Sequence, residues 1–431
     1  MALEGIRILD ASDVIGHYAG RILADLGADV IKVEPVGGDP TRRWAPLLPD
    51  VAELESGLQF LLLNANKRGI TIDVTQPRGR ELYLALTKTA DVLIDSLQEH
   101  EAVEFGLTAD HLIEVKPDLI HTSITGWGLS GPRANWAYAD IVGCAMSGTM
   151  QLVGLADGPP EQLPDMQGYH TASIQAAAGT MGAIVYRQST GEGQRVEVSM
   201  QEAMSIAQET AMMQADILGT NRERGKPQFG LDLPGSGLYE AADGYVFLIA
   251  SGLAGSGFPG LVRLMAETGD EEDLFEEPFR TFITDVMGTT QLRDILLDPG
   301  GTSSPSHRSS EISHLLPHMD DVVRKFCKKH PKSYLYEEGQ KRRILVGIVN
   351  TPNDILESQQ LKERNWFVDL EDTKRGVTLR YPGPQWQLQG TPAQLRRPAP
   401  MLGEHNNEVL SEIGIDESEL SELVAEGVIA G

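Results

Sequence analysis

The sequence predicts an α/β fold in which helices flank a parallel sheet, together with a second, smaller domain. Short apolar runs of strand length recur at residues 6–10, 29–34, 90–95 and 118–125, with helical stretches between them. Such alternation of strands and helices is typical of a parallel sheet. The chain has 431 residues, of which 41% are hydrophobic. It is therefore long enough for two or three domains with sizeable cores.

Two helices are expected between these strands, at 17–26 and 78–89. A third helix at 168–187 is rich in alanine and glycine, which permits close packing against a neighbouring helix. It leads through a glycine-containing turn into a strand at 195–200, and a further helix follows to about residue 218. These elements continue the same α/β pattern.

The pattern changes after residue 218. A strand is expected at 243–250, residues 270–340 are more charged and irregular, and 299–310 reads as an exposed loop. Alternation of strand and helix resumes near Ile344. We therefore predict three segments: 1–220 as the first part of a large domain, 221–340 as a small domain, and 341–431 as the return to the large domain with a C-terminal tail.

The composition excludes several classes of function. The formal net charge is −26, which disfavours nucleic acid and an anionic membrane surface as partners. Cys144 and Cys327 cannot form a disulfide framework, and neither belongs to a metal-binding cluster. The start of the chain lacks the pattern of a signal peptide, and no apolar run approaches the length of a membrane helix. We expect a cytoplasmic protein without a metal.

Two pairs of residues, one of glycines and one of basic residues, could contact a ligand phosphate. Gly16 and Gly20, near the first strand–helix turn, could let a phosphate approach a helix N-terminus, or could simply permit close packing. Lys67 and Arg68 follow an apolar run and could bind phosphates, or could lie in a solvated loop between strands.

Three further residues are candidates for chemistry. Asp140 lies among apolar residues and is either a functional carboxylate or, as we favour, a buried helix cap. Asp165 precedes the small-residue helix, where an acid is favoured by the helix dipole, or it could be a nucleophile. His170 reads as a core histidine rather than a base. Taken alone, these residues do not identify a reaction.

Six phrases, in this order and spacing, resemble the family III CoA-transferases, which include formyl-CoA transferase, carnitine CoA-transferase and α-methylacyl-CoA racemase. The resemblance runs from about Leu3 to Ile429. The phrases are LADLGADVIKVEPVGGDPTR (23–42), NANKRGITIDV (64–74), GWGLSGP (126–132), RQSTGEGQRVEVSMQEA (187–203), TPNDILESQQL (351–361) and RRPAPMLGEHNNEVL (396–410).

The resemblance implies a Rossmann-like large domain, a smaller domain, and two chains threaded through each other as interlocked rings. It also implies CoA and acyl-CoA as substrates, with no permanently bound cofactor. In this family an aspartate attacks an acyl-CoA thioester and forms a mixed anhydride, then an aspartyl-CoA thioester. The positions that the resemblance assigns to CoA binding are Val14, Ile15, Lys67, Arg68 and Ser96.

The chain departs from the family pattern at its functional positions. The nucleophile position, counted back from Arg187, reads Gly168, and Asp165 lies three residues upstream. Glu104 stands where formyl-CoA transferase-like members place an arginine, and an acid there would repel a CoA phosphate. Ala139 replaces the catalytic histidine of the racemases, which disfavours racemase chemistry.

These departures suggest a companion subunit without the nucleophile. Within the family, heteromeric benzylsuccinate CoA-transferase pairs a competent subunit with a related companion. We expect a paralogous partner chain that carries the aspartate, and transfer of CoA from a donor such as succinyl-CoA to a carboxylic acid such as benzylsuccinate. Two alternatives remain: a self-sufficient homodimeric transferase that uses Asp165, and a CoA-ester-binding protein without turnover.

Overall fold

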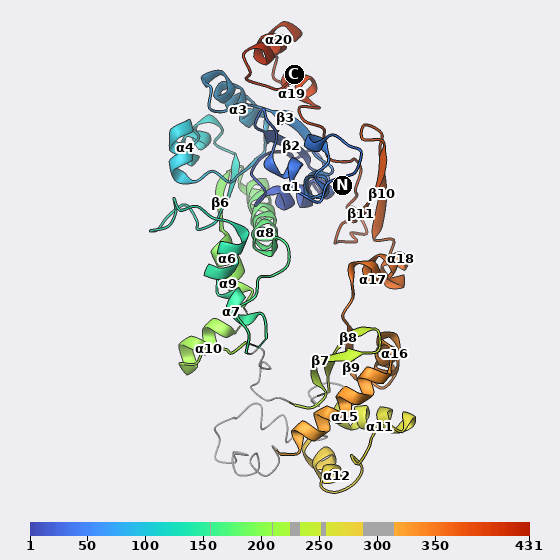
Figure 1. Ribbon diagram of the computed structural model, residues 1–431. Coiled ribbons are helices and arrows are strands. Elements are labelled where there is room, and N and C mark those ends of the chain that lie inside the picture. Colours follow the sequence, from blue (N-terminus) through green and yellow to red (C-terminus); the bar gives the residue numbers. More distant parts are fainter. Residues whose placement is uncertain (156, 209, 225–232, 251–255, 288–313) are drawn as a thin grey trace. The chain divides into compact units, whose positions relative to one another are not determined.

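The computed structural model divides the chain into two compact units (Figure 1). The first unit contains residues 1–224 and 359–431, and the second contains residues 225–358. The structure describes the whole chain except residues 156, 209, 225–232, 251–255 and 288–313. The loop predicted at 299–310 lies outside the described residues.

A six-stranded parallel sheet forms the centre of the first unit, in the order β3-β2-β1-β4-β5-β6. Its strands are β1 (Arg7–Ala11), β2 (Asp29–Glu34), β3 (Arg68–Thr71), β4 (Val92–Asp95), β5 (Ile120–Thr125) and β6 (Gln194–Ser199). The predicted α/β class is therefore confirmed. This strand order is that of Rossmann-like sheets, which bind ligands beyond the carboxyl ends of the strands where the order reverses. Here that point lies between β1 and β4.

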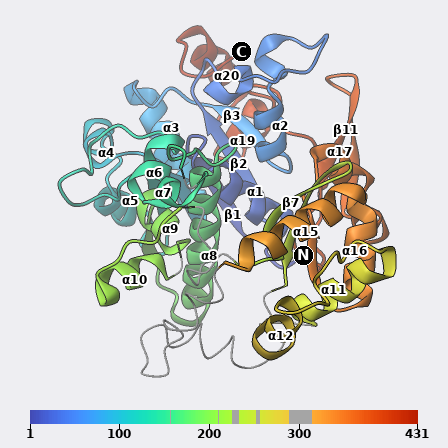
Figure 2. The same ribbon diagram turned by 60° about the horizontal axis from the view of Figure 1, so that its bottom comes forward.

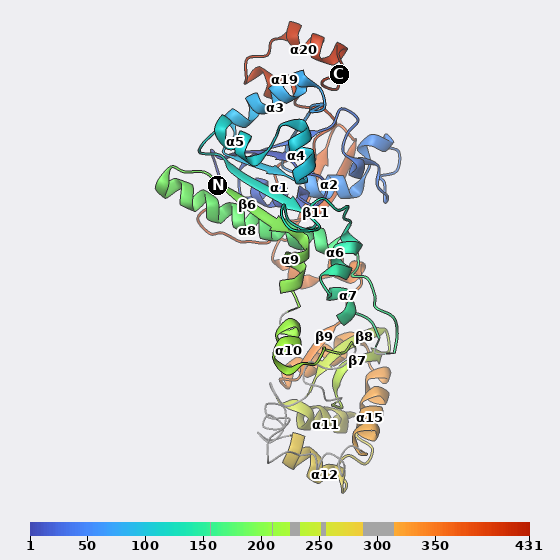
Figure 3. The ribbon, with the colours of Figure 1, turned by 90° about the vertical axis from the view of Figure 1, so that its left-hand side faces the viewer.

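Helices cover both faces of the sheet (Figure 3). On one face, α1 (His17–Asp25) and α8 (Gln167–Thr190) pack together, and small side chains such as Ala172 and Ala176 allow close contact. On the other face, α3 and α5 share a core with the C-terminal helices. The remaining helices of this unit are α2 (Leu58–Asn64), α3 (Pro77–Thr89), α4 (Glu99–Phe105), α5 (Ala109–Val115), α6 (Asp140–Met146), α7 (Thr149–Leu152), α9 (Met200–Ile206), α10 (Ala211–Leu218), α18 (Gln359–Glu363), α19 (Asn406–Ser411) and α20 (Glu417–Ala425), with 3₁₀ turns η1 (Pro40–Arg43) and η2 (Glu53–Glu55).

The C-terminal part of the first unit is tied to its N-terminal part by buried ion pairs. An antiparallel hairpin, β10 (Phe367–Asp372) and β11 (Val377–Pro382), contains Arg375 in its turn. Arg375 forms ion pairs with Asp372 and with Glu55, and Glu55 also pairs with Arg42. All four residues are buried, so the pairing fixes the return of the chain after Gln359.

The second unit is built on a three-stranded antiparallel sheet of β7 (Ser236–Ala241), β8 (Gly244–Ile249) and β9 (Leu345–Ile348). Helix α15 packs on β7 (Figure 2), and α16 packs on β8 and β9 (Figure 1). Because β9 pairs with β8, the strand near Ile344 belongs to this unit, whereas the sequence analysis expected the return near residue 341. Its helices are α11 (Gly257–Thr268), α12 (Phe279–Phe282), the π-helical turn η3 (Ile283–Met287), α15 (Leu316–Lys329), α16 (Lys332–Lys341) and α17 (Pro352–Glu357).

Within the part of the chain that the structure describes, none of the helices has both the length and the apolar character that a membrane span requires.

Candidate functional site

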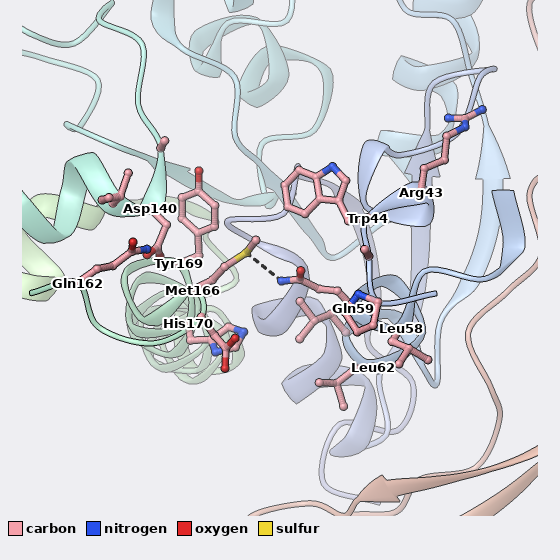
Figure 4. A pocket seen from close by; sticks show the side chains of 16 residues that line it. Arg43, Trp44, Leu58, Gln59, Leu62, Asp140, Gln162, Met166, Tyr169 and His170 are labelled. Carbon is pink, nitrogen blue, oxygen red and sulfur yellow. Dashed lines mark hydrogen bonds between the residues drawn. The ribbon is translucent and has the colours of Figure 1, made fainter. Parts of the chain in front are cut away.

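A cavity of about 930 Å³ lies in the first unit, beside the start of α8 (Figure 4). One wall comes from the segment after β2, with Trp44, Leu58 and Leu62 as its main apolar side chains. The opposite wall comes from the starts of α6 and α8, with Asp140 and Tyr169 among its residues. The cavity thus combines an apolar wall with a wall that carries polar and acidic groups.

Local interactions of the chain fix the apolar wall. Pro40 opens η1, and the Asp39 side chain caps this turn by accepting a hydrogen bond from the Thr41 N–H at 2.9 Å. Arg42 is buried and forms a bidentate ion pair with Glu34 at the end of β2. Trp44 lies two residues after Arg42, at the C-cap of η1, so its position depends on this buried ion pair.

Helix α2 contributes Leu58 and Leu62, which are four residues apart and therefore lie on one face. The opposite face of α2 carries Phe60 and Leu61, which are buried in the core. The two walls meet where the Gln59 side-chain amide donates a hydrogen bond to the Met166 sulfur at 2.8 Å (Figure 4). This contact joins α2 to the start of α8.

Asp140 stabilises the start of α8. It is the first residue of α6 but does not cap that helix; its Oδ1 accepts a hydrogen bond from the Tyr169 N–H at 2.9 Å. The Cys144 thiol donates to Oδ2 at 3.5 Å. Asp140 is thus buried and accepts a hydrogen bond from a helix N-terminus, as a helix cap does. The helix is α8, however, and the N–H belongs to a residue 29 positions later in the sequence. The exposure of Asp140 is only 8%.

The pKa values of three side chains near Asp140 are shifted in the direction that favours their neutral forms. Burial and the nearby Asp140 raise the pKa of Cys144 to about 11, and burial with Asp13 and Asp140 raises the pKa of Tyr169 to about 12. Burial lowers the pKa of His170, although Asp140 and Asp165 act in the opposite direction. The thiol, the phenol and the imidazole are therefore neutral at pH 7.

Gly168 lies in the first turn of α8, where the resemblance places a nucleophilic aspartate. A Cβ built on Gly168 would lie 3.0 Å from Asp140 Oδ1, 3.1 Å from Met200 Sδ and 3.4 Å from Cys144 Sγ. Other side chains therefore surround the position that a side chain of residue 168 would take.

Asp165 lines the same cavity but is exposed. Its backbone φ is +55°, and α8 begins beyond it, with Met166 at the N-cap position and no side-chain cap. Asp165 therefore lies one residue before the N-cap of α8, as an acid near the start of this helix that does not cap it. The His170 ring packs against Tyr18 in a tilted arrangement, with 5.3 Å between the ring centroids, and its buried Nε2 has no hydrogen-bond partner among the described residues.

Three of the positions assigned to CoA by resemblance meet at the switch point of the sheet. Val14 and Ile15 follow β1, Ser96 follows β4, and the Asp13 N–H donates to the Ser96 hydroxyl at 2.8 Å. The Ser173 hydroxyl of α8 donates to the Ile15 carbonyl, so this loop also adjoins α8. The structure thus brings Val14, Ile15 and Ser96 together where ligands bind in Rossmann-like sheets.

The two glycines near this loop are explained by packing. A Cβ at Gly16 would lie 2.4 Å from Ser12 Cβ, and one at Gly20 would lie 2.3 Å from Asp10 Oδ2. Of the two interpretations left open by the sequence, close packing accounts for both glycines.

Lys67 and Arg68 do not lie in a solvated loop. Lys67 has 0% exposure, and its ammonium group donates to Asp10 Oδ2, the His17 carbonyl and Asn64 Oδ1 at 2.7, 2.8 and 2.8 Å. Arg68 begins β3 and pairs with Asp29 as well as with Glu408 and Glu412 of the C-terminal segment. All three ammonium protons of Lys67 are used within the protein, which leaves this group unsuited to a ligand phosphate.

Sequence reasoning missed the apolar wall of the cavity. Trp44, Leu58 and Leu62 show no periodicity that distinguishes them from ordinary core residues, and their positions depend on the buried Arg42 ion pairs. The adjacent pair Arg43 and Trp44 offered one signal, an aromatic ring beside a cation in the segment that follows the strand predicted at 29–34.

Comparisons with known proteins agree with this fold. The sequence profile of CoA-transferase family III matches residues 3–406. The chain is 32% identical over 426 residues to subunit BbsE of succinyl-CoA:(R)-benzylsuccinate CoA-transferase from Thauera aromatica, covering 98% of this chain and 97% of the relative. It is 30% identical to formyl-CoA:oxalate CoA-transferase from Streptomyces avermitilis, covering 99% of each chain.

The structural comparison leads to the same group. The crystal structure of a CAIB/BAIF family protein from Brucella suis matches with a TM-score of 0.78 at 25% identity, covering 95% of this chain and 98% of that protein. The profile match, the relatives and the shared fold each extend over nearly the whole chain. This chain belongs to CoA-transferase family III.

Proposed function

We propose that the chain is a subunit of a CoA-transferase assembled from two related chains, and that its partner carries the nucleophilic aspartate. Family membership supports transfer of CoA in general. The relative from Thauera aromatica is by its name a subunit, which supports an assembly of different chains. The proposed reaction moves CoA from an acyl-CoA such as succinyl-CoA to an aromatic succinate such as benzylsuccinate.

One observation carries the companion role: the first turn of α8 in this chain contains Gly168, which has no side chain to attack a thioester. Covalent transfer needs a carboxylate whose oxygen reaches the thioester carbonyl at about 3–3.5 Å. In the proposed reaction, the partner's carboxylate attacks that carbon, the C–S bond breaks, and the CoA thiolate leaves. The thiolate then attacks the aspartyl carbonyl of the mixed anhydride and releases the donor acid.

The second half of the reaction repeats these steps with the acceptor. The acceptor carboxylate attacks the aspartyl-CoA thioester, and the CoA thiolate leaves again. The thiolate then attacks the acyl carbon of the new anhydride, which forms the product thioester and regenerates the aspartate. No oxidant, metal or other cofactor is needed for this sequence to balance.

The charges that line the cavity also favour binding of the acyl substrate by the partner chain. Asp140 and Asp165 both line it, and the Arg43 side chain is directed away from Asp140 and His170 (Figure 4). A dicarboxylic acyl group would bring a second negative charge toward these carboxylates, which is unfavourable. We therefore place the dicarboxylic substrate at the pocket of the partner.

Part of the CoA-binding assignment remains in this proposal. Val14, Ile15 and Ser96 lie at the switch point of the sheet, where Ile15 also contacts Ser173 of α8, so they are the residues of this chain that we propose to contact CoA. Lys67 and Arg68 are no longer proposed to bind CoA, because acceptors within the protein engage them.

A second candidate is a homodimeric transferase in which Asp165 is the nucleophile. The observation in its favour is that Asp165 is exposed and lines the cavity. The two proposals differ in the activity of the isolated chain. A third possibility, a CoA-ester-binding protein without turnover, differs from both because no partner would make it active.

The test is a turnover assay with the chain alone and after co-expression with a related chain of the same organism. Activity only in the complex supports the companion role. Turnover by the isolated chain that is lost in Asp165→Asn supports the second candidate. Light scattering after size-exclusion chromatography should show the two-chain assembly that the family's interlocked rings imply, and a stable monomer in the active sample would contradict it.

A further inference from the structure

Three metal-ligating side chains meet in the second unit. Among the described residues, Glu272, Asp273 and His318 each offer one ligand atom, and these atoms all lie within 4.8 Å of one another. We propose that they form a binding site for a divalent transition-metal cation such as Zn²⁺. The inference does not depend on the proposed CoA chemistry, since none of the three residues lines the cavity of the first unit.

Two segments that are distant in sequence supply the donors. Glu272 and Asp273 lie in the connection between α11 and α12, and His318 lies in the first turn of α15. Because 45 positions separate Asp273 from His318, no closely spaced ligand motif marks the site, and the sequence analysis accordingly expected no metal. The structure brings the two side chains together, with 2.7 Å between His318 Nε2 and Asp273 Oδ1.

Packing orients the imidazole before any ion binds. The His318 ring lies against the Phe279 ring of α12 in a tilted arrangement, with 4.9 Å between the ring centroids. Metal sites are most precise when neighbouring contacts hold the ligand side chains in place. The contact with Phe279 therefore reduces the freedom that His318 would lose on binding an ion.

The separations suit an ion with short bonds to oxygen and nitrogen. Zinc lies about 2.0–2.2 Å from such ligands, so two of its ligand atoms are no more than about 4.4 Å apart. The present limit of 4.8 Å exceeds this value only slightly. The side chains of Glu272, Asp273 and His318 are 41%, 43% and 38% exposed, so they can adjust and water can complete the coordination.

The charge around the three donors favours a cation. Residues 269–278 contain six acidic residues and no lysine or arginine. Glu271 Oε2, in the same segment, is buried and has no hydrogen-bond partner among the described residues. Neighbouring carboxylates disfavour each other's charged forms, and a bound divalent cation would be the largest local charge that offsets this repulsion.

One lysine already contacts the group, but the ion can displace it at little cost. Lys325 Nζ lies 3.1 Å from Glu272 Oε1 and 2.8 Å from Asp321 Oδ2. When an ion takes Glu272, Lys325 keeps the nearer of these two acidic partners. An exposed ion pair such as that between Lys325 and Glu272 contributes little to stability, because both groups are well solvated when apart.

The donor set selects the kind of metal. Imidazole nitrogen suits zinc, nickel, copper and iron, whereas Mg²⁺ and Ca²⁺ prefer oxygen ligands. One imidazole with two carboxylates should therefore bind Zn²⁺ more tightly than Mg²⁺ or Ca²⁺. An ion at this point would join the connection between α11 and α12 to α15, and so would stabilise the second unit.

Calorimetric titration of the untagged, EDTA-treated full-length chain with ZnCl₂ tests the site. We expect saturable binding of one Zn²⁺ per chain. In His318→Phe, which keeps a ring beside Phe279, and in Glu272→Gln, the Kd should rise at least about tenfold, because even groups that only support a metal ligand are worth about 10–100-fold in affinity.

Two matched controls separate the site from general attraction to acids. Glu276→Gln makes the same change of charge in the same segment, and His111→Phe removes an exposed imidazole that pairs with Glu114 at 3.7 Å. Both controls should bind Zn²⁺ like the wild type. Equal weakening in Glu276→Gln and Glu272→Gln, binding of Mg²⁺ as tight as that of Zn²⁺, or no saturable binding would overturn the proposal.

A second measurement needs no variant and applies if a substitution prevents folding. Hydrogen–deuterium exchange of the wild type is compared with and without Zn²⁺. Peptides that cover 269–278 and 316–322 should exchange more slowly with the ion, whereas the peptide around His111 should not change. Unchanged exchange in both segments would refute the site. Neither measurement involves a partner chain or turnover, so its failure leaves the proposed function untouched.

Discussion

Replacing Lys67 by methionine should destabilise the first unit severely, because it breaks a fully buried ion pair. Lys67 and Asp10 both have 0% exposure, and their charged atoms lie 2.7 Å apart. Methionine keeps the apolar stem but removes the ammonium group from three acceptors. Among the described residues, Asp10 then keeps an ion pair with Lys32, at the longer distance of 3.9 Å.

The magnitude follows from the exposure of the pair. Burial alone would raise the pKa of Asp10, but Lys67 and Lys32 outweigh it and lower the pKa to about 2, so this carboxyl is charged at pH 7. Removal of one partner from a buried pair costs about 3–5 kcal/mol, since a charge remains without compensation. In Asp10→Asn/Lys67→Met the loss should be smaller than the sum of the single losses by about 0.5–3 kcal/mol.

Urea unfolding followed by tryptophan fluorescence is the appropriate assay. All five tryptophans belong to the first unit, so the signal reports on the part of the chain that contains the pair. Lys88→Met, an exposed lysine at the end of α3, is the matched control and should change stability by less than about 0.5 kcal/mol. A Lys67→Met variant as stable as this control would refute the structural role and restore the phosphate-binding interpretation.

Three further predictions concern the same unit. Gly20→Ala places a Cβ 2.3 Å from the fixed carboxylate of Asp10 and should cost about 1–3 kcal/mol in urea unfolding, whereas Gly37→Ala, which meets nothing within 4 Å, should be neutral. Burial lowers the pKa of His17, so the unfolded chain binds the proton more readily and the unfolding free energy should fall as pH drops below about 6.5. His17→Gln should lose this part of the pH dependence, and an unchanged slope would contradict the assignment. Asp165→Gly should keep both Tm and turnover of the assembled enzyme, because glycine suits the φ of +55° and no helix cap is removed; a fall of several orders of magnitude in turnover would identify Asp165 as the nucleophile.

The regular elements of the first unit could be predicted because each is encoded locally. The runs at 6–10, 29–34 and 118–125 became β1, β2 and β5, since buried parallel strands read as continuous apolar sequence. The helix at 168–187 became α8 because its small residues repeat along one face. Resemblance of whole phrases added the family and the glycine at position 168.

The missed features depend on partners that are distant in sequence. Strand β3 begins with Arg68, a charged residue that is not expected in a buried strand. Its burial depends on Glu408 and Glu412, which lie some 340 residues away, so no local pattern predicts this strand. Lys67 likewise gave no sign of burial, since Asp10 lies 57 residues earlier. The role of Asp140 depends on the Tyr169 N–H, which no local pattern connects to it.

The central claim is that acyl transfer uses a carboxylate of the partner chain. Trapping with hydroxylamine tests it most directly, because hydroxylamine converts an activated aspartyl carbonyl into a stable hydroxamate that mass spectrometry locates. The complex is incubated with succinyl-CoA, treated with hydroxylamine and digested. We predict a hydroxamate on an aspartate of the partner chain and none on this chain. A hydroxamate on Asp165 or Asp140 would contradict the companion role and make this chain the one that carries the acyl group.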